Sequence, residues 1–122
     1  MGRQVNRLSE SREETGYAEA RYRQLLERLE LLRNQIATLT ASLQSMRQAL
    51  QRLEKLENVE TVYERAGHIL VPRKRDEALE ELRLNVEATE SVLKKYQEEE
   101  REVRTELRQL IEGLSSGGAG SS

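Results

Sequence analysis

The fold is decided by residues 61–75, which read TVYERAGHILVPRKR. The segments 61–63 and 69–71 are rich in β-branched and aromatic residues, and Gly67 between them suits a tight turn. The second segment, three aliphatic residues in a row, would place apolar side chains on both faces of a strand. Pro72 cannot donate to a ladder, so it should lie at a strand end or on an edge. The stretch therefore predicts a β-hairpin over residues 61–74 that other chains must cover, and the alternative is an irregular loop.

Two heptad-patterned segments flank the hairpin. Apolar residues recur in steps of three and four from Tyr22 to Leu53, and a second series runs from Leu79 to Leu114. We expect one helix over about residues 11–57, entered through a capping box at 11–14, and another over about 76–113. Residues 1–16 are then an N-terminal extension that is partly disordered or helical, and residues 17–114 form the main domain. The second helix is expected to stop at Gly113, and residues 115–122 form a flexible Ser/Gly tail.

The two apolar series form matching seams when the chain folds back at the hairpin. Partners then have residue numbers that add up to 132, although a shift by one heptad would also align part of the seams. In this register two layers are imperfect, because Leu32 faces Glu100 and Leu43 faces Thr89. Such polar residues can fix the register, or the glutamate can reach out to solvent, which we favour. The fold class is mainly α: a long antiparallel two-helix coiled coil with one β-hairpin at the bend.

The composition excludes several functions. The net charge is −2, which removes the electrostatic case for nucleic acid, and there is no Cys and no apolar run long enough for a membrane span. The single histidine, His68, lies at the predicted turn without a second metal ligand, and the basic run 73–75 is expected to be solvated rather than to touch RNA or an acidic partner. No catalytic constellation occurs. We expect no enzyme activity, metal, cofactor, nucleic-acid or membrane partner, and a soluble, cytoplasmic protein.

The hairpin and its two helices closely resemble the β-class subunit of prefoldin, of the archaeal type, over about residues 17–114. The most specific match is Tyr63, Gly67 four positions later and the aliphatic triplet 69–71; the α class has two hairpins. The resemblance implies a hexamer of two α and four β subunits whose hairpins join into β-barrels at a hub. It also implies an ATP-independent chaperone that holds non-native proteins at the coiled-coil tips and delivers them to a group II chaperonin. The extension 1–16 departs from the family's pattern.

These expectations assign two groups of residues. The hub residues are Val62, Tyr63, Gly67, Ile69, Leu70 and Val71. The client-binding tip residues, apolar side chains among Glu and Arg near the free end of the seam, are Tyr17, Tyr22, Val103, Leu107, Leu110, Ile111 and Leu114. Some of these residues could instead only close the coiled coil. Two other functions remain open: a structural or adaptor coiled-coil subunit without holding activity, and a regulatory prefoldin-like subunit of a different complex.

Overall fold

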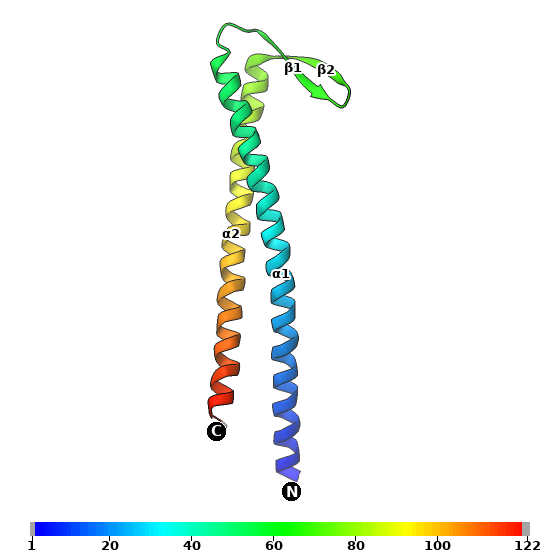
Figure 1. Cartoon of the computed structure of the whole chain (residues 1–122), viewed down its shortest axis with the longest axis vertical. Coiled ribbons are helices and arrows are strands. Elements are labelled where there is room, and N and C mark those ends of the chain that lie inside the picture. The colour runs from blue at the N-terminus through cyan, green and yellow to red at the C-terminus, as the bar shows by residue number, and fades with distance from the viewer. Residues whose placement is uncertain (1, 121–122) are drawn as a thin grey trace. The chain divides into compact units, whose positions relative to one another are not determined.

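The computed structural model describes the backbone of residues 2–120 and the side chains of residues 10 and 12–115. The elements follow in the order α1 (Gly2–Lys55), β1 (Thr61–Ala66), β2 (Ile69–Lys74) and α2 (Arg75–Gly120) (Figure 1). One antiparallel hairpin therefore lies between two long helices in the chain, as the sequence predicts. The strand boundaries lie inside the predicted range of 61–74.

The helix ends differ from the prediction. Helix α1 is already helical at Gly2, so it runs through the capping box predicted to start it at Ser11. Helix α2 continues to Gly120, seven residues past the predicted stop at Gly113. A glycine ends a helix when it takes a left-handed conformation, and among the described residues only Gly67 has a positive φ. Much of the predicted tail and all of the described N-terminal extension therefore have helical backbone.

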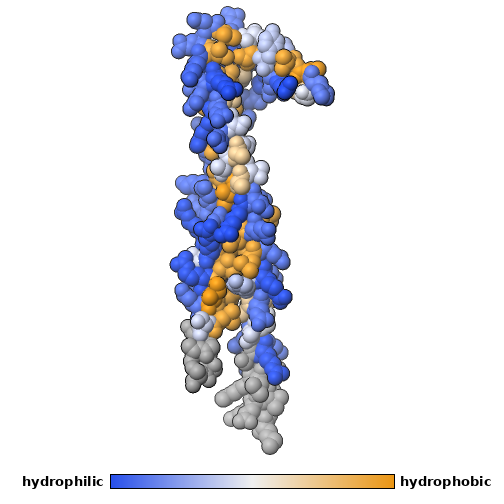
Figure 2. All heavy atoms as spheres, in the orientation of Figure 1, coloured by the Kyte–Doolittle hydropathy of each residue, from blue (hydrophilic) through white to orange (hydrophobic). Residues whose placement is uncertain are grey.

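The chain divides into two compact units, and α1 and α2 pair within each. The terminal unit comprises residues 1–35 and 96–122, and the hairpin unit comprises residues 36–95. The terminal unit has a continuous core of buried seam residues. Figure 2 shows an orange strip between polar flanks along this part of the molecule, which is formed by atoms of apolar residues that reach the surface. Its buried members are Leu25, Leu29, Leu32, Val103 and Leu107, with Tyr22, Tyr96 and Leu110 packed against them. In the hairpin unit the buried residues are Leu43, Leu79 and Val86.

Four ion pairs confirm the predicted register independently of the apolar residues. We label the seam positions a and d, and the positions that flank the seam e and g. In an antiparallel pair, g faces g on one side of the seam and e faces e on the other. The g pairs join residues whose numbers add up to 127, and the e pairs join residues whose numbers add up to 137, five on either side of 132. A one-heptad shift would separate all four pairs. They are Arg21–Glu106 and Arg28–Glu99 in the terminal unit, and Arg47–Glu90 and Glu54–Arg83 in the hairpin unit.

The polar seam residue Glu100 is largely covered, with a side chain that is 16% exposed, and it is paired with an arginine. Its carboxylate lies 2.6 Å from the Arg104 guanidinium one turn further along α2. Leu32, which faces it in the register, is nevertheless fully buried. The leucine side of this layer is thus buried, and the glutamate is neutralised by Arg104; the predicted extension of Glu100 into solvent is only partial.

Candidate functional site

The hairpin has a fixed register and a tight turn. Six residue pairs connect the strands, from Thr61 opposite Lys74 to Ala66 opposite Ile69. Gly67 and His68 form the two-residue turn, and Gly67 has φ 63° while His68 does not have a positive φ. A positive φ at the first turn position alone is the type II′ pattern, whose twist matches that of the flanking strands.

The two faces of this sheet both carry apolar side chains that nothing in the described chain covers. Ile69 and Val71 lie on one face, and Tyr63 and Leu70 lie on the other. Ile69, Leu70 and Tyr63 are 64–66% exposed. The described sheet contains only two strands, so each strand also has one unpaired edge. The hairpin residues predicted from the sequence all lie in the two strands or the turn, and apolar side chains are exposed on both faces of the sheet, as predicted.

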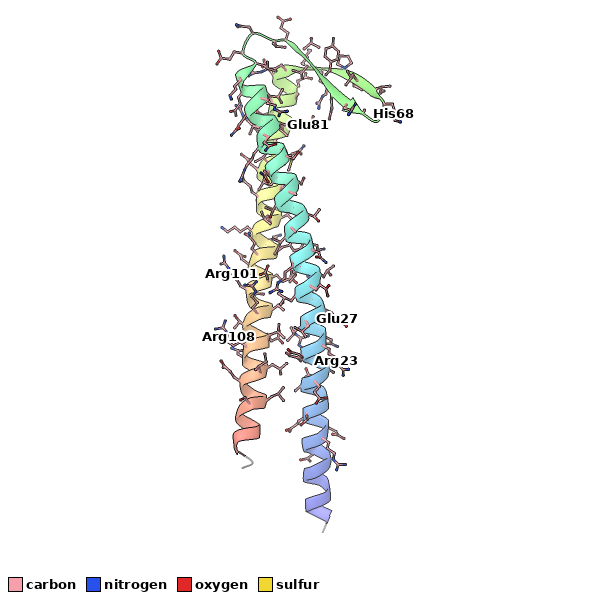
Figure 3. All side chains as sticks on the ribbon, in the orientation of Figure 1. Arg23, Glu27, His68, Glu81, Arg101 and Arg108 are labelled. Atoms are coloured by element: carbon pink, nitrogen blue, oxygen red, sulfur yellow. The ribbon has the colours of Figure 1, made fainter. Side chains whose placement is uncertain are left out.

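Arg73 connects the hairpin to helix α2. Its guanidinium lies 3.3 Å from the Glu64 carboxylate on β1 and also hydrogen-bonds to Glu81 on α2, which is labelled in Figure 3. The hydrogen bond to Glu81, followed by its negative charge, raises the pKa of the Arg73 guanidinium. Val62, opposite Arg73 in the ladder, is half-buried against a groove that Leu53 and other helix residues line. The base of the hairpin is therefore packed and charge-paired while its far part is free.

Arg75 ties the start of α2 to the end of α1. Its Nε and Nη2 atoms donate hydrogen bonds of 3.1 and 2.9 Å to the carbonyl oxygen of Leu53, and Nη2 lies 3.4 Å from that of Glu54. Its backbone N–H donates a 2.8 Å hydrogen bond to the carbonyl of Glu60. A cation at a helix C-terminus satisfies unpaired carbonyls and complements the helix dipole. The prediction of a solvated basic run is thus wrong for Arg73 and Arg75, because folding brings carboxylates and carbonyls to both; Lys74 is exposed.

The predicted tip residues, all in the terminal unit, fall into three classes. Tyr17, Ile111 and Leu114 are exposed, at 73%, 50% and 41%. Two more, Tyr22 and Leu110, are partly buried against the core. The other two, Val103 and Leu107, are buried members of that core. An open groove borders the exposed group and is lined by Glu19, Tyr22, Arg23, Ile111, Leu114 and Ser115.

Sequence reasoning missed two features of this surface. Leu26 is 41% exposed beside the seam although it lies in a leucine-rich run. Its heptad position e, directly after Leu25, could have shown this. The four ion pairs across the seam could also have been read from the e and g positions. By contrast, no local signal identifies the carbonyls that Arg75 caps.

The described residues contain neither a possible membrane span nor a possible metal site. No described helix is long and apolar enough to cross a membrane. Nor do three or more His, Asp or Glu side chains gather into a possible metal site in this part of the chain. His68 stands at the hairpin turn in Figure 3.

Comparison with known proteins identifies this arrangement. The family model described as prefoldin subunit matches residues 18–116. The chain belongs to the prefoldin subunit family. Its structure is similar to the crystal structure of the prefoldin beta subunit from Thermococcus strain KS-1, with a TM-score of 0.76 and 22% sequence identity, covering 85% of this chain and 91% of that one. No curated protein matches the chain. The family and the prefoldin β fold inferred from the hairpin residues are confirmed, and the chain is a chaperone-type subunit of a multi-subunit prefoldin complex.

Proposed function

We propose that this prefoldin subunit is a β-class member of a cytoplasmic hexamer with two α-type and four β-type subunits. Its hairpin joins the hub, and its terminal unit holds non-native proteins, without ATP, before they pass to a group II chaperonin. The observation that carries the proposal is the exposure of Ile69, Leu70 and Tyr63 on both faces of a two-stranded sheet. Transfer to the chaperonin is supported by the family membership.

Assembly through the hairpin follows from the energetics of a free two-stranded sheet. Such a sheet is marginally stable in water, and its unpaired edges accept further strands. Full burial of a side chain such as Ile69 or Leu70 contributes about 1.5–3 kcal/mol. Because the two lie on opposite faces, a partner on one face would leave the other exposed. A closed barrel of hairpins would remove the edges and bury the inward face, and other parts of the assembly would have to cover the outward face.

Client holding by the terminal unit is supported by single apolar side chains among charged ones. Tyr17, Ile111 and Leu114 are accessible as the structure stands. The partly buried Tyr22 and Leu110 extend this surface. Val103 and Leu107 would reach a client only when the end of the seam opens, which costs less at a terminus because the last layers have neighbours on one side only. Several subunits acting on one client would raise the overall affinity through effective concentration.

The test combines assembly with client protection. The full chain is mixed with an α-type subunit, the mass is measured by light scattering, and the complex is added to a chemically unfolded client whose aggregation is followed by turbidity. We expect a hexamer that suppresses aggregation. The variant Ile111→Ser/Leu114→Ser should assemble normally and lose most of the protection.

Each result has a different meaning. A chain that stays a lone monomer in the mixture would refute assembly through the hairpin. A hexamer without protection would favour the adaptor function. Protection that the serine variant retains in full would remove these two residues from the capture surface.

A further inference from the structure

The two sides of the seam in the terminal unit carry different chemistry. On the g side, Arg21 and Arg28 of α1 form ion pairs with Glu106 and Glu99 of α2. The first of these pairs is bidentate, with hydrogen bonds of 2.9 and 3.1 Å. On the e side, the described side chains form no ion pair between the two helices in this unit. One side of the seam is therefore closed by charge pairs and the other is open.

The open e side has an apolar centre. The confirmed register places Leu26 of α1 opposite Ile111 of α2, and these side chains are 41% and 50% exposed. Ile111 also lines the groove that Tyr22, Leu114 and Arg23 border. The apolar centre is thus continuous with the proposed capture surface, but it lies on one side of the seam only.

Arginines surround this apolar centre. Arg33 and Arg104 take the next opposing e positions, and Arg23, Arg101 and Arg108 lie on the neighbouring b positions. Figure 3 shows Arg23 projecting from α1, and Arg101 and Arg108 projecting from α2. Arg104 has Glu100 as its partner. Among the described side chains, the other four form no ion pair.

Acidic residues on this side are fewer. Glu19 and Glu30 lie at the e and b positions of α1, whereas the corresponding positions of α2 from 97 to 115 have no carboxylate. The glutamates of this part of α2 gather at the a, c, f and g positions instead. They are Glu98, Glu99, Glu100, Glu102, Glu106 and Glu112.

Coiled-coil stability does not account for this distribution. Like charges at facing positions destabilise helix pairs, so placing Arg33 opposite Arg104 has a cost. On the g side, by contrast, opposite charges occupy the facing positions and form ion pairs across the seam. Unpaired arginines around exposed aliphatic side chains instead offer an electrostatic and an apolar contact to one ligand.

We propose that the e side of the terminal unit selects non-native segments in which carboxylates lie close to apolar side chains. Leu26 and Ile111 receive the apolar side chains, and the surrounding arginines pair with the carboxylates. This inference rests on the proposed holding function and names the class of client. Nucleic acid fits less well, because the centre is aliphatic, the e and b positions of this unit carry no aromatic side chain, and the nearby Tyr22 is partly buried against the core.

The test uses two fluorescent peptides and the full chain in its assembled complex. One peptide contains Leu and Glu spaced by Gly and Ser, and the other has Lys in place of every Glu. Binding is measured by fluorescence anisotropy for wild type and for Arg101→Gln/Arg108→Gln. The matched control is Arg52→Gln/Lys95→Gln, which removes the same charge from exposed c positions of the hairpin unit.

We expect wild type to prefer the Glu peptide, and the Arg101→Gln/Arg108→Gln variant to bind it about fivefold more weakly. The control should bind like wild type, and added salt should reduce the preference. Equal binding of both peptides by wild type would overturn the inference and leave the holding function standing. Failure to bind either peptide would contradict the holding function itself. A single-stranded oligonucleotide that binds more tightly than the Glu peptide would also overturn the inference.

Discussion

The two units expose apolar residues in different ways, and the difference separates two kinds of recognition. In the hairpin unit, the apolar side chains project from a sheet with a fixed six-pair register and open edges, so a partner must match both backbone and side chains. In the terminal unit, Tyr17, Ile111 and Leu114 project from helices whose backbone is internally hydrogen-bonded. A ligand can therefore contact only the side chains there and not the backbone, and such contacts suit ligands without a fixed structure. Similar exposed fractions thus support the specific interface that we propose for the hairpin unit and the tolerant one that we propose for the terminal unit.

The largest expected effect concerns the hairpin. The variant Ile69→Ser/Leu70→Ser should abolish assembly with an α-type subunit, because it removes an apolar side chain from each face of every copy. Light scattering of the mixture measures the loss, and circular dichroism should show unchanged helix. Ile111→Ser/Leu114→Ser serves as the matched control, since it makes an equal polar change in the other unit. If both variants assembled to the same extent, the apolar residues of the hairpin would not differ from those of the terminal unit in their contribution to assembly, and the comparison would be wrong.

A smaller effect is expected from the core of the terminal unit. Leu32→Ala should lower the free energy of unfolding by about 2–5 kcal/mol, because this fully buried side chain leaves a cavity. Its neighbour Leu31 is 48% exposed, and Leu31→Ala should change stability by no more than about 0.5 kcal/mol. Urea denaturation of the two variants measures the difference. Equal losses would contradict the assignment of Leu32 to the seam.

The smallest effect concerns the connection between the helices. Arg75→Ala should lower the free energy of unfolding by about 1–2 kcal/mol, because carbonyl oxygens at the end of α1 lose a charged donor. The exposed neighbour provides the control, and Lys74→Ala should leave stability unchanged within about 0.5 kcal/mol. Thermal or urea unfolding of both variants gives the comparison. A loss with Lys74→Ala as large as that with Arg75→Ala would show that the capping bonds do not contribute.

The features predicted correctly from the sequence are those that local pattern determines. The Tyr63 to Val71 stretch specifies strands and turn by residue type, and heptad spacing specifies the seam. The register needed two series of residues that match over many layers, and it was confirmed by flanking ion pairs such as Arg28–Glu99. These predictions succeed because each can be read from a sequence pattern: residue type for the hairpin, heptad spacing for the seam, and the match of two heptad series for the register.

The features that could not be predicted depend on groups brought together by folding, or on small energy differences. The contacts of Arg75 with the carbonyls of α1 join residues more than twenty positions apart. The end of α2 depended on whether Gly113 takes a left-handed conformation, which a glycine permits but does not require. The seam pattern also could not separate buried Leu107 from exposed Leu114, because exposure depends on how far the partner helix covers each layer.

The capping by Arg75 has a mechanical consequence. Arg75 is the first residue of α2. Its side chain donates hydrogen bonds to a carbonyl at the end of α1, and its backbone N–H donates one to the carbonyl of Glu60. Tension applied between the two helices can therefore pass through Arg75 without stretching the linker or shearing the strands. At the bend, a force that separates the end of α1 from the start of α2 would act on the Arg75 hydrogen bonds before it reached the strand ladder.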